Sequence, residues 1–218
     1  AATGKPVCAF VNSGPPLSIG NLVSKVPAVM QCWYLGQESG YAIADALFGE
    51  MNPSGKLPIS FPRTVGHIPA YYNYKPSARR GYNLGFQVSP LFAFGHGLSY
   101  TTFEYSKPVL SSTTMKMSGT ITLSVEVKNT GSRKGAEIVQ LYVRDDYSSV
   151  PRPVKELKGF QKIWLEPGQS ETVSFTINKE MLSFYDVDMK WNAEPGDFTL
   201  MVGTASDNTQ NVSFRLVK

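Results

Sequence analysis

The pattern of hydrophobic positions changes character twice along the chain. Near the N-terminus it consists of two short continuous apolar runs, residues 6–12 and 28–34, which are typical of strands buried on both faces of a sheet. The segment between them, residues 17–25, has room for only a short helical connection. We therefore predict a parallel pair of strands at the end of an α/β layer.

A helix is the next predicted element, over residues 37–50, and Gly49 and Asn52-Pro53 end it. Its apolar positions form one arc at 100° per residue, which includes Tyr41, Ile43, Leu47, Phe48 and Met51. Two strands and one helix cannot close a core, because a parallel sheet needs both faces covered and its edges paired. Residues 1–62 are thus predicted to be the C-terminal part of an α/β sandwich domain whose remainder lies elsewhere.

Residues 63–106 lose the periodicity and are rich in Gly, Pro and aromatic residues. Eleven aromatic side chains fall between Phe61 and Tyr105, too much apolar mass for a disordered loop. We predict an aromatic-rich connecting strap that packs across the elements on either side.

From residue 107 onward the pattern is typical of β-strands. Turn signals at Asn129-Thr-Gly131, Glu166-Pro-Gly168 and Glu194-Pro-Gly196 separate short alternating runs. This spacing predicts an all-β unit over residues 107–218, a fibronectin type III-like (immunoglobulin-like) β-sandwich. No cysteine follows position 32, which excludes a disulfide-pinned core. The predicted strands are 120–128, 137–144, 159–165, 171–177, 182–186, 198–203 and 212–217.

Charge and composition exclude several classes of protein. The net charge of the 218 residues is +4, and basic and acidic residues are interspersed without a basic stripe, so we expect no nucleic-acid partner. No apolar run approaches the roughly 20 residues that cross a bilayer, and no leader is visible at the start. We expect no membrane span and no unprocessed precursor.

Metal and cofactor chemistry have no visible carrier. Cys8 and Cys32 lie in apolar runs at a spacing that fits no zinc or redox motif, and we expect both to be buried free thiols. His67 and His96 have no Cys, Asp or Glu at ligand spacing. Gly95-His-Gly97 suits a turn into a strand and lacks the helix start of a phosphate loop. The sequence thus predicts neither metal nor cofactor.

Three pairs of carboxylates could be considered for hydrolysis, which needs two acids facing each other across a cleft. Glu38 and Asp45 lie on one face of the predicted helix, beside the apolar arc, where acidic side chains are expected simply because that face is exposed to solvent. Asp145-Asp146 suits the end of a strand, and Asp186 and Asp188 suit a hairpin turn. A nucleophile elbow of the G-x-S-x-G kind is absent. We therefore name no catalytic residue.

Aromatic side chains are the remaining functional signal, because sugar rings stack on them. Tyr72, Tyr74, Tyr82 and Phe86 are the candidates for the wall of a substrate cleft. The alternative is that most aromatic residues of the strap, with Phe92 and Phe94, pack against the neighbouring units.

Many stretches, in order along almost the whole chain, resemble the C-terminal region of family 3 glycoside hydrolases, the β-glucosidase and β-xylosidase group. In the first half these are Gly4-Lys-Pro6, Trp33-Tyr-Leu-Gly-Gln-Glu38, Asn52-Pro-Ser-Gly-Lys-Leu-Pro58, Tyr71-Tyr-Asn73 and Phe94-Gly-His-Gly-Leu-Ser-Tyr-Thr101. In the second half they are Gly135-Ala-Glu137, Val139-Gln-Leu-Tyr-Val143, Arg152-Pro-Val-Lys-Glu-Leu-Lys-Gly-Phe160 and Glu194-Pro-Gly196. His96 stands where relatives often have an aromatic residue.

The resemblance implies three successive units: a barrel with an aspartate nucleophile, an α/β sandwich with a glutamate acid/base, and a fibronectin type III-like domain. This chain matches only the part that follows both catalytic residues. It implies a C-terminal portion of a retaining β-glycosidase that hydrolyses terminal β-linked sugars in carbohydrate breakdown, with this chain as scaffold and cleft wall. The isolated chain is expected to be inactive.

The resemblance also implies partners: the upstream barrel and α/β part of the same enzyme, and a glycoside or oligosaccharide substrate. Left uncovered, the apolar helix arc predicts an oligomer. Scarce cysteines and the sequon at Asn211 are compatible with a periplasmic or secreted protein. The alternative is a non-catalytic carbohydrate-binding or adhesive β-sandwich module, which residues 1–62 disfavour because they match the enzyme's α/β unit.

Overall fold

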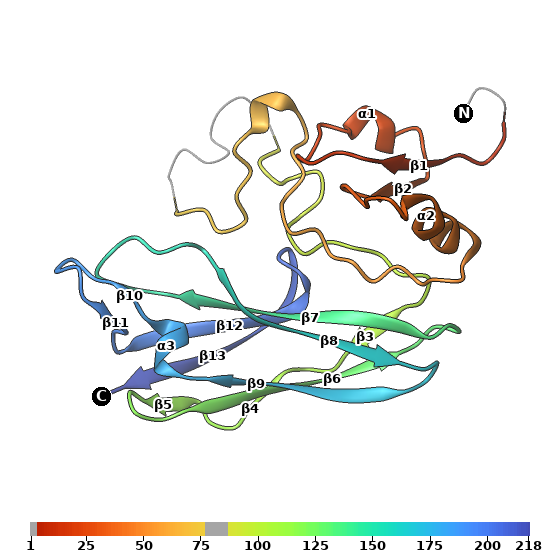
Figure 1. Ribbon diagram of the computed structural model, residues 1–218. Helices are drawn as coiled ribbons and strands as arrows, with labels where there is room; N and C mark the ends of the chain where they lie inside the picture. Colours follow the sequence, from red (N-terminus) through yellow and green to blue (C-terminus); the bar gives the residue numbers. More distant parts are fainter. Residues whose placement is uncertain (1–3, 77–86) are drawn as a thin grey trace.

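The computed structural model describes residues 4–76 and 87–218. Its N-terminal part is a parallel two-stranded sheet, β1 (Cys8–Val11) and β2 (Ala28–Gln31), connected through the short helix α1 (Gly20–Val23). The helix α2 (Ser39–Phe48) follows and lies beside β2 (Figure 1). The elements predicted for this part are present, with shorter strands than the apolar runs suggested.

Burial in this part differs from the prediction. Cys8 and Ala28 are exposed and the other residues of both strands are only partly covered, so the prediction of strands buried on both faces is wrong for this chain. Within α2 only Ala46 is buried. The helix ends at Gly49, whose φ of 85° is left-handed and therefore suits glycine. The predicted strands and helix therefore form, but no other layer covers their outer faces in the part of the chain that is described.

The segment between α2 and the first sandwich strand lies between the two parts of the molecule (Figure 1). It contains the short 3₁₀ helix η1 (Val65–His67) and a β-bridge between Phe61 and Phe92. Phe61 is 1% exposed and makes edge-on ring contacts with Trp33 and Phe92. Aromatic packing thus joins Phe92 of the strap, through Phe61, to Trp33 of the N-terminal part.

The C-terminal part is a sandwich of two sheets. The first has the strand order β5-β13-β12-β7-β8, and in the second β6 pairs with β3, β4 and β9. All of these pairs are antiparallel except β13 with β5. The strands are β3 (Phe103–Tyr105), β4 (Val109–Leu110), β5 (Thr114–Lys116), β6 (Ile121–Asn129), β7 (Gly135–Asp145), β8 (Glu156–Leu165), β9 (Ser170–Ile177), β12 (Gly196–Ala205) and β13 (Asn208–Val217).

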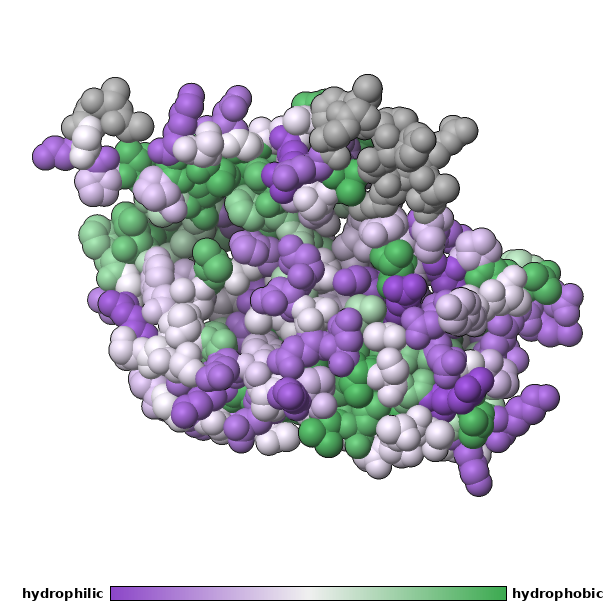
Figure 2. Space-filling view, turned by 180° about the vertical axis from the view of Figure 1, so that it is seen from behind, coloured by the Kyte–Doolittle hydropathy of each residue, from purple (hydrophilic) through white to green (hydrophobic). Residues whose placement is uncertain are grey.

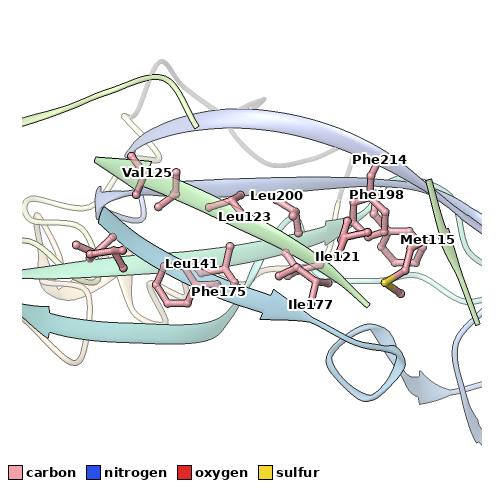
Figure 3. Close-up of a cluster of buried hydrophobic side chains, with 14 of the residues drawn as sticks. Met115, Ile121, Leu123, Val125, Leu141, Phe175, Ile177, Phe198, Leu200 and Phe214 are labelled. Atoms are coloured by element: carbon pink, nitrogen blue, oxygen red, sulfur yellow. The ribbon is translucent and has the colours of Figure 1, made fainter. Parts of the chain in front are cut away.

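The core lies between these two sheets (Figure 3). Strand β6 shows how the sequence builds it, because Ile121, Leu123, Val125 and Val127 alternate with more exposed residues and are at most 3% exposed. Leu141 and Leu200 meet them from the opposite sheet and are fully buried. A period of two in the sequence therefore becomes one continuous apolar layer.

One predicted strand is wrong in its bounds. Residues 182–186 were expected to be a strand, but Leu182 ends the short helix α3 (Lys179–Leu182) and only β10 (Phe184–Tyr185) is extended. Asn178 caps the helix by accepting a hydrogen bond from the Met181 N–H at 3.1 Å, which favours a helical turn over a longer strand. Strand β11 (Trp191–Asn192) completes a hairpin with β10, and β3, β4, β5 and β11 were not predicted.

Candidate functional site

Tyr72 joins the strap to the sandwich. Its ring stacks on Phe94 with centroids 4.2 Å apart, and the edge of Tyr142 on β7 contacts it at 5.9 Å. The Leu157 N–H on β8 donates a hydrogen bond to its hydroxyl at 3.1 Å. The ring is therefore held by packing, and it fixes residues 71–76 against the sheet.

The other three candidate cleft residues have different placements. Tyr74 is partly buried, and its carbonyl accepts a hydrogen bond from the Val154 N–H at 2.9 Å. Tyr82 and Phe86 lie outside the described residues. The structure therefore places Tyr72 against β7 and β8. It places Tyr74 beside the loop that connects these two strands.

A buried ion pair forms a second contact with the sandwich, from Lys56, which lies a few residues before the strap. Lys56 Nζ lies 3.1 Å from Glu137 Oε1, and both side chains are at least nine-tenths buried. Lys56 also donates to the Gly97 carbonyl at 3.1 Å, and the Tyr105 hydroxyl donates to the same Glu137 oxygen at 3.0 Å. Burial raises the pKa of Glu137, and the ammonium of Lys56 acts against that rise. The pair holds the segment around Lys56, just before the strap, at a fixed position on β7.

Gln140 makes a third contact from the same strand. Its side-chain N–H group donates to the carbonyls of Gly95 at 3.1 Å and Thr204 at 2.6 Å, while its oxygen accepts from the Tyr142 hydroxyl at 2.6 Å. Gly95 has a φ of 82°, and a Cβ there would collide with the Gln140 side chain. The glycine thus allows the strap to approach the sheet closely.

Sequence reasoning missed Glu137 and Gln140 as residues of this junction. Both are 3% exposed, although polar residues of this size are seldom buried without partners. The available signal was their position within an otherwise apolar strand, between Gly135 and Val143. Two polar residues in such a run indicate a second layer that supplies hydrogen-bond partners.

The carboxylates considered for catalysis have other roles. Asp45 is exposed on α2, and Glu38 is exposed immediately before the first residue of that helix. Asp186 accepts from the N–H groups of Asp188 at 2.9 Å and Lys190 at 3.0 Å, which shapes the β10–β11 turn. Asp146 accepts from the Thr199 hydroxyl at 2.9 Å. These placements agree with the turn, strand-end and solvated-flank interpretations.

Asp145 also has a perturbed environment. Burial raises its pKa to about 6, and the nearby Arg152 guanidinium only partly offsets that effect. Its Oδ2 atom is buried without a hydrogen-bond partner. Asp145 is the last residue of β7, so its raised pKa is a property of the sandwich and not of the candidate cleft wall.

The histidines and cysteines take structural positions. His67 Nε2 lies 3.1 Å from the Val88 carbonyl, and His96 stacks on Phe92 with a pKa lowered mainly by burial. Cys32 is buried, but Cys8 is exposed, so the expectation of two buried thiols is wrong for Cys8. Its strand lacks a covering layer on that side. Among residues 4–76 and 87–218 no cluster of three His, Cys, Asp or Glu side chains could hold a metal ion.

A large apolar surface remains on the N-terminal part. Figure 2 shows it as a broad hydrophobic area over the β1, β2 and α2 end of the molecule. Its most exposed members are Tyr34 and Phe48, both 79% exposed, and Tyr41, 74% exposed. Monomeric proteins seldom expose a contiguous apolar patch of this kind without a partner. None of the described helices is long and apolar enough to cross a membrane.

Two family models match the chain. The C-terminal domain of glycosyl hydrolase family 3 matches residues 1–100, and the fibronectin type III-like domain matches residues 137–206. Both matches confirm the predicted fold class, an α/β part followed by a β-sandwich. The family resemblance inferred from the motifs is confirmed as well.

Curated relatives extend the similarity over almost the whole chain. A periplasmic β-glucosidase of Salmonella typhimurium is 47% identical over 99% of this chain, and a β-xylosidase of Formosa agariphila is 46% identical over 97%. This chain spans about 30% of the length of each of these relatives.

Solved structures give the same result. A β-glucosidase from Listeria innocua in complex with glucose superposes with a TM-score of 0.93 at 34% identity, covering 100% of this chain and 32% of that one. A β-glucosidase from Erythrobacter marinus gives a TM-score of 0.95 at 42% identity, covering 99% of this chain and 29% of that one.

Proposed function

The chain belongs to the C-terminal region of the family 3 glycosyl hydrolases, and from this premise we propose that it is the non-catalytic portion of a retaining β-glycosidase. Such an enzyme hydrolyses terminal β-linked sugars through a pair of carboxylates, one a nucleophile and one an acid/base. The acid pairs singled out in this chain serve as exposed helix residues, turn formers or strand ends. The two catalytic carboxylates therefore belong to other parts of the enzyme.

The contribution of this chain is a scaffold with part of the cleft wall. The sandwich holds the strap through Tyr72 and Gln140, and it holds the segment just before the strap through the Lys56–Glu137 pair. Each contact joins β7 or β8 to a described residue of the strap or of the segment just before it, so these residues are held against the sheet. We assign the cleft wall to the segment that contains Tyr72, Tyr74, Tyr82 and Phe86. Tyr72 holds residues 71–76 of this segment in place. The proposed units are residues 1–62, 63–106 and 107–218.

The observation that carries this proposal is the uncovered apolar face of the N-terminal part. Tyr41 and Phe48 on α2 and Tyr34 after β2 are largely exposed, while this chain accounts for about 30% of its relatives' length. The proposed occupant of that face is the upstream barrel and α/β portion of the same enzyme. Burying apolar area stabilises such a contact by about 25 cal/mol per Å² before association entropy is subtracted.

We place the enzyme in the periplasm or outside the cell. The support is the Salmonella relative, whose name places it in the periplasm.

The test compares the chain alone with the chain co-expressed with the coding sequence upstream of residue 1. Alone, the purified chain should release no nitrophenol from aryl β-glucosides or β-xylosides above background. Co-expression should give a complex that co-purifies and hydrolyses at least one of these substrates. Hydrolysis by the isolated chain that is lost in Glu38→Gln or Asp45→Asn would contradict the proposal.

A matched pair of substitutions tests the docking face itself. Phe48→Asp places a charge on α2 and should reduce recovery of the complex at least tenfold. Tyr147→Asp changes an even more exposed aromatic residue, 86% exposed, on the sandwich and should leave recovery within twofold. Equal loss in both variants, or none in Phe48→Asp, would show that α2 does not face the upstream part.

A further inference from the structure

The β10–β11 hairpin exposes an unusual amount of apolar surface for seven consecutive residues, 185–191. Tyr185, Val187, Met189 and Trp191 are between 48% and 73% exposed. The rings of Tyr185 and Trp191 contact each other with centroids 5.1 Å apart and planes tilted by 59°. The Trp191 Nε1–H donates to Glu180 Oε1 at 2.8 Å, which fixes the orientation of the indole. The hairpin therefore presents a preset aromatic face.

Two grooves meet at Trp191. One, with a volume of about 250 Å³, lies between the hairpin and the loop that precedes β8, and Arg152, Glu156 and Lys158 contribute to its wall. The other, with a volume of about 400 Å³, lies between the hairpin, α3 and the turn that follows β5, and Ser118, Thr120 and Asn178 contribute to its wall. The indole forms a wall shared by both grooves.

The chemistry of these walls indicates the class of ligand. An aromatic wall is surrounded by hydroxyl, amide, carboxylate and ammonium groups, so the grooves offer both hydrogen-bond donors and acceptors. A peptide helix or a lipid chain needs a continuous apolar floor. In the first groove the apolar residues Val150, Pro151 and Pro153 share the wall with the charged residues Arg152, Glu156 and Lys158, so its surface is mixed rather than continuously apolar. A saccharide matches them, because one face of its ring is apolar C–H surface and its rim consists of hydroxyls that donate and accept.

We infer that the Trp191 hairpin and its two grooves form a binding site for a neutral oligosaccharide, with one sugar ring stacked on the indole. The chain of sugars crosses the hairpin, and its hydroxyls contact the polar walls on either side. Arg152 is held in place on one side by Phe184, whose ring centre lies 4.3 Å from its guanidinium carbon, and by an ion pair with Glu156. Groups fixed before binding cost little ordering entropy.

The site lies away from the proposed docking face. In Figure 1 the hairpin and α2 are at opposite ends of the view, separated by the length of the sandwich. The inference depends only on the hairpin and its grooves, so it stands whether or not the whole protein proves to be a β-glycosidase. The binding experiment below uses no activity assay, which keeps the two proposals separable.

Trp164, on β8 of the same sandwich, is a matched control for Trp191. It is 56% exposed on β8, close to the 48% of Trp191. The ammonium of Lys162 lies 4.9 Å from the centre of its ring, and Trp164 contributes to neither groove. An exposed tryptophan that lines neither of these two grooves should not bind the sugar.

The experiment titrates the 218-residue chain with cellopentaose, laminaripentaose, xylopentaose and maltopentaose up to 10 mM. The measurements are isothermal calorimetry and amide chemical-shift changes. At least one of the four should bind saturably with a dissociation constant of about 0.1–5 mM, equivalent to a binding free energy of roughly 3.1–5.5 kcal/mol. Trp191→Ala should weaken that binding at least tenfold, and Trp164→Ala should change it less than twofold.

The shift measurement protects the test against a misfolded variant, because it uses the unaltered chain. Shifts concentrated at residues 117–120, 152–158, 178–185 and 191 support the site. No saturable binding of any of the four sugars would overturn the inference. Shifts centred elsewhere, or binding that a folded Trp191→Ala variant retains, would overturn it as well.

Discussion

The two ends of this molecule use apolar residues in opposite ways. In the sandwich, side chains such as Leu123, Leu141 and Leu200 are fully buried between two sheets. In the N-terminal part, the apolar arc of α2 points outward, with Leu47 49% and Phe48 79% exposed. Apolar side chains thus stabilise the sandwich by packing inside it, whereas in the N-terminal part they lie on the surface and need a partner to cover them. A chain can hold one complete unit and one incomplete unit in a single structure.

The difference follows from the sheets. The sandwich has two sheets that cover each other, so each strand finds a neighbour and a facing layer. The N-terminal sheet has two strands, β1 and β2, and its residues are at best partly buried. Two strands and a helix leave edges and faces open. Completeness of the layers, rather than hydrophobicity of the sequence, separates the two parts.

Cutting the chain between Tyr100 and Thr101 gives the largest expected effect. Residues 101–218 keep β3 with its partner β6 and the buried hydrogen bond from the Thr101 hydroxyl to Asn129 at 2.7 Å. This fragment should unfold cooperatively, while residues 1–100 should show no cooperative transition. Circular dichroism melts of both fragments measure the difference, and a cooperative melt of residues 1–100 would show that the N-terminal part is complete by itself.

The buried ion pair between the two parts comes next. Lys56→Met leaves Glu137 buried and unpaired, which should cost about 3–5 kcal/mol of unfolding free energy. Lys56→Met combined with Glu137→Met removes both charges and should recover more than half of that loss, although the Tyr105 hydroxyl then loses its acceptor. Urea titrations provide the free energies. A double variant as unstable as Lys56→Met alone would refute the role of the pair.

Matched leucine substitutions compare the two parts directly. Leu141→Ala in the sandwich core should destabilise the chain by about 2–5 kcal/mol, because it opens a cavity in a packed layer. Leu47→Ala on α2 should change the stability by less than about 0.5 kcal/mol, because its side chain is half exposed. Thermal melts are sufficient for this measurement. Similar losses at both positions would mean that α2 is covered in solution.

The smallest predicted effect depends on pH. Burial raises the pKa of Asp145 to about 6 from an ordinary 3.8, so the folded chain favours the neutral carboxyl and loses stability as pH rises through 6. Asp145→Asn removes this loss. After allowance for partial exposure, the stability of the variant relative to the original chain should rise by about 1 kcal/mol between pH 4 and pH 7.5. A constant difference across that range would contradict the expected titration.

Sequence patterns predicted the sandwich well because its information is local. The alternation in 121–129 and the turn at Glu166-Pro-Gly168 fix strand and hairpin without reference to distant residues. The short strands β4 and β11 escaped prediction, since two residues carry no period. The helix α3 escaped it because the capping bond from Asn178 overrides the local β-rich composition.

The candidate site was harder to predict because its contacts are between residues far apart in sequence. Lys56 and Glu137 are 81 positions apart, and no local sequence pattern around either residue indicates that the two form an ion pair. The sequence indicates Tyr72 as a cleft candidate only through its aromatic character. Its stacking on Phe94 could not be predicted, because it depends on where the strap crosses β7. The exposure of Cys8 likewise depends on a layer that these residues do not supply.

Amide hydrogen exchange on the intact 218-residue chain tests the central claim most directly, because it measures the stability of both parts in one molecule. The account predicts that the amides of β6, β7 and β12 exchange only through global unfolding. The hydrogen-bonded amides of β1, β2 and α2 should exchange at least a hundredfold faster. Equal protection across the two parts would contradict the account, because it would show that the N-terminal part is stabilised by this chain alone.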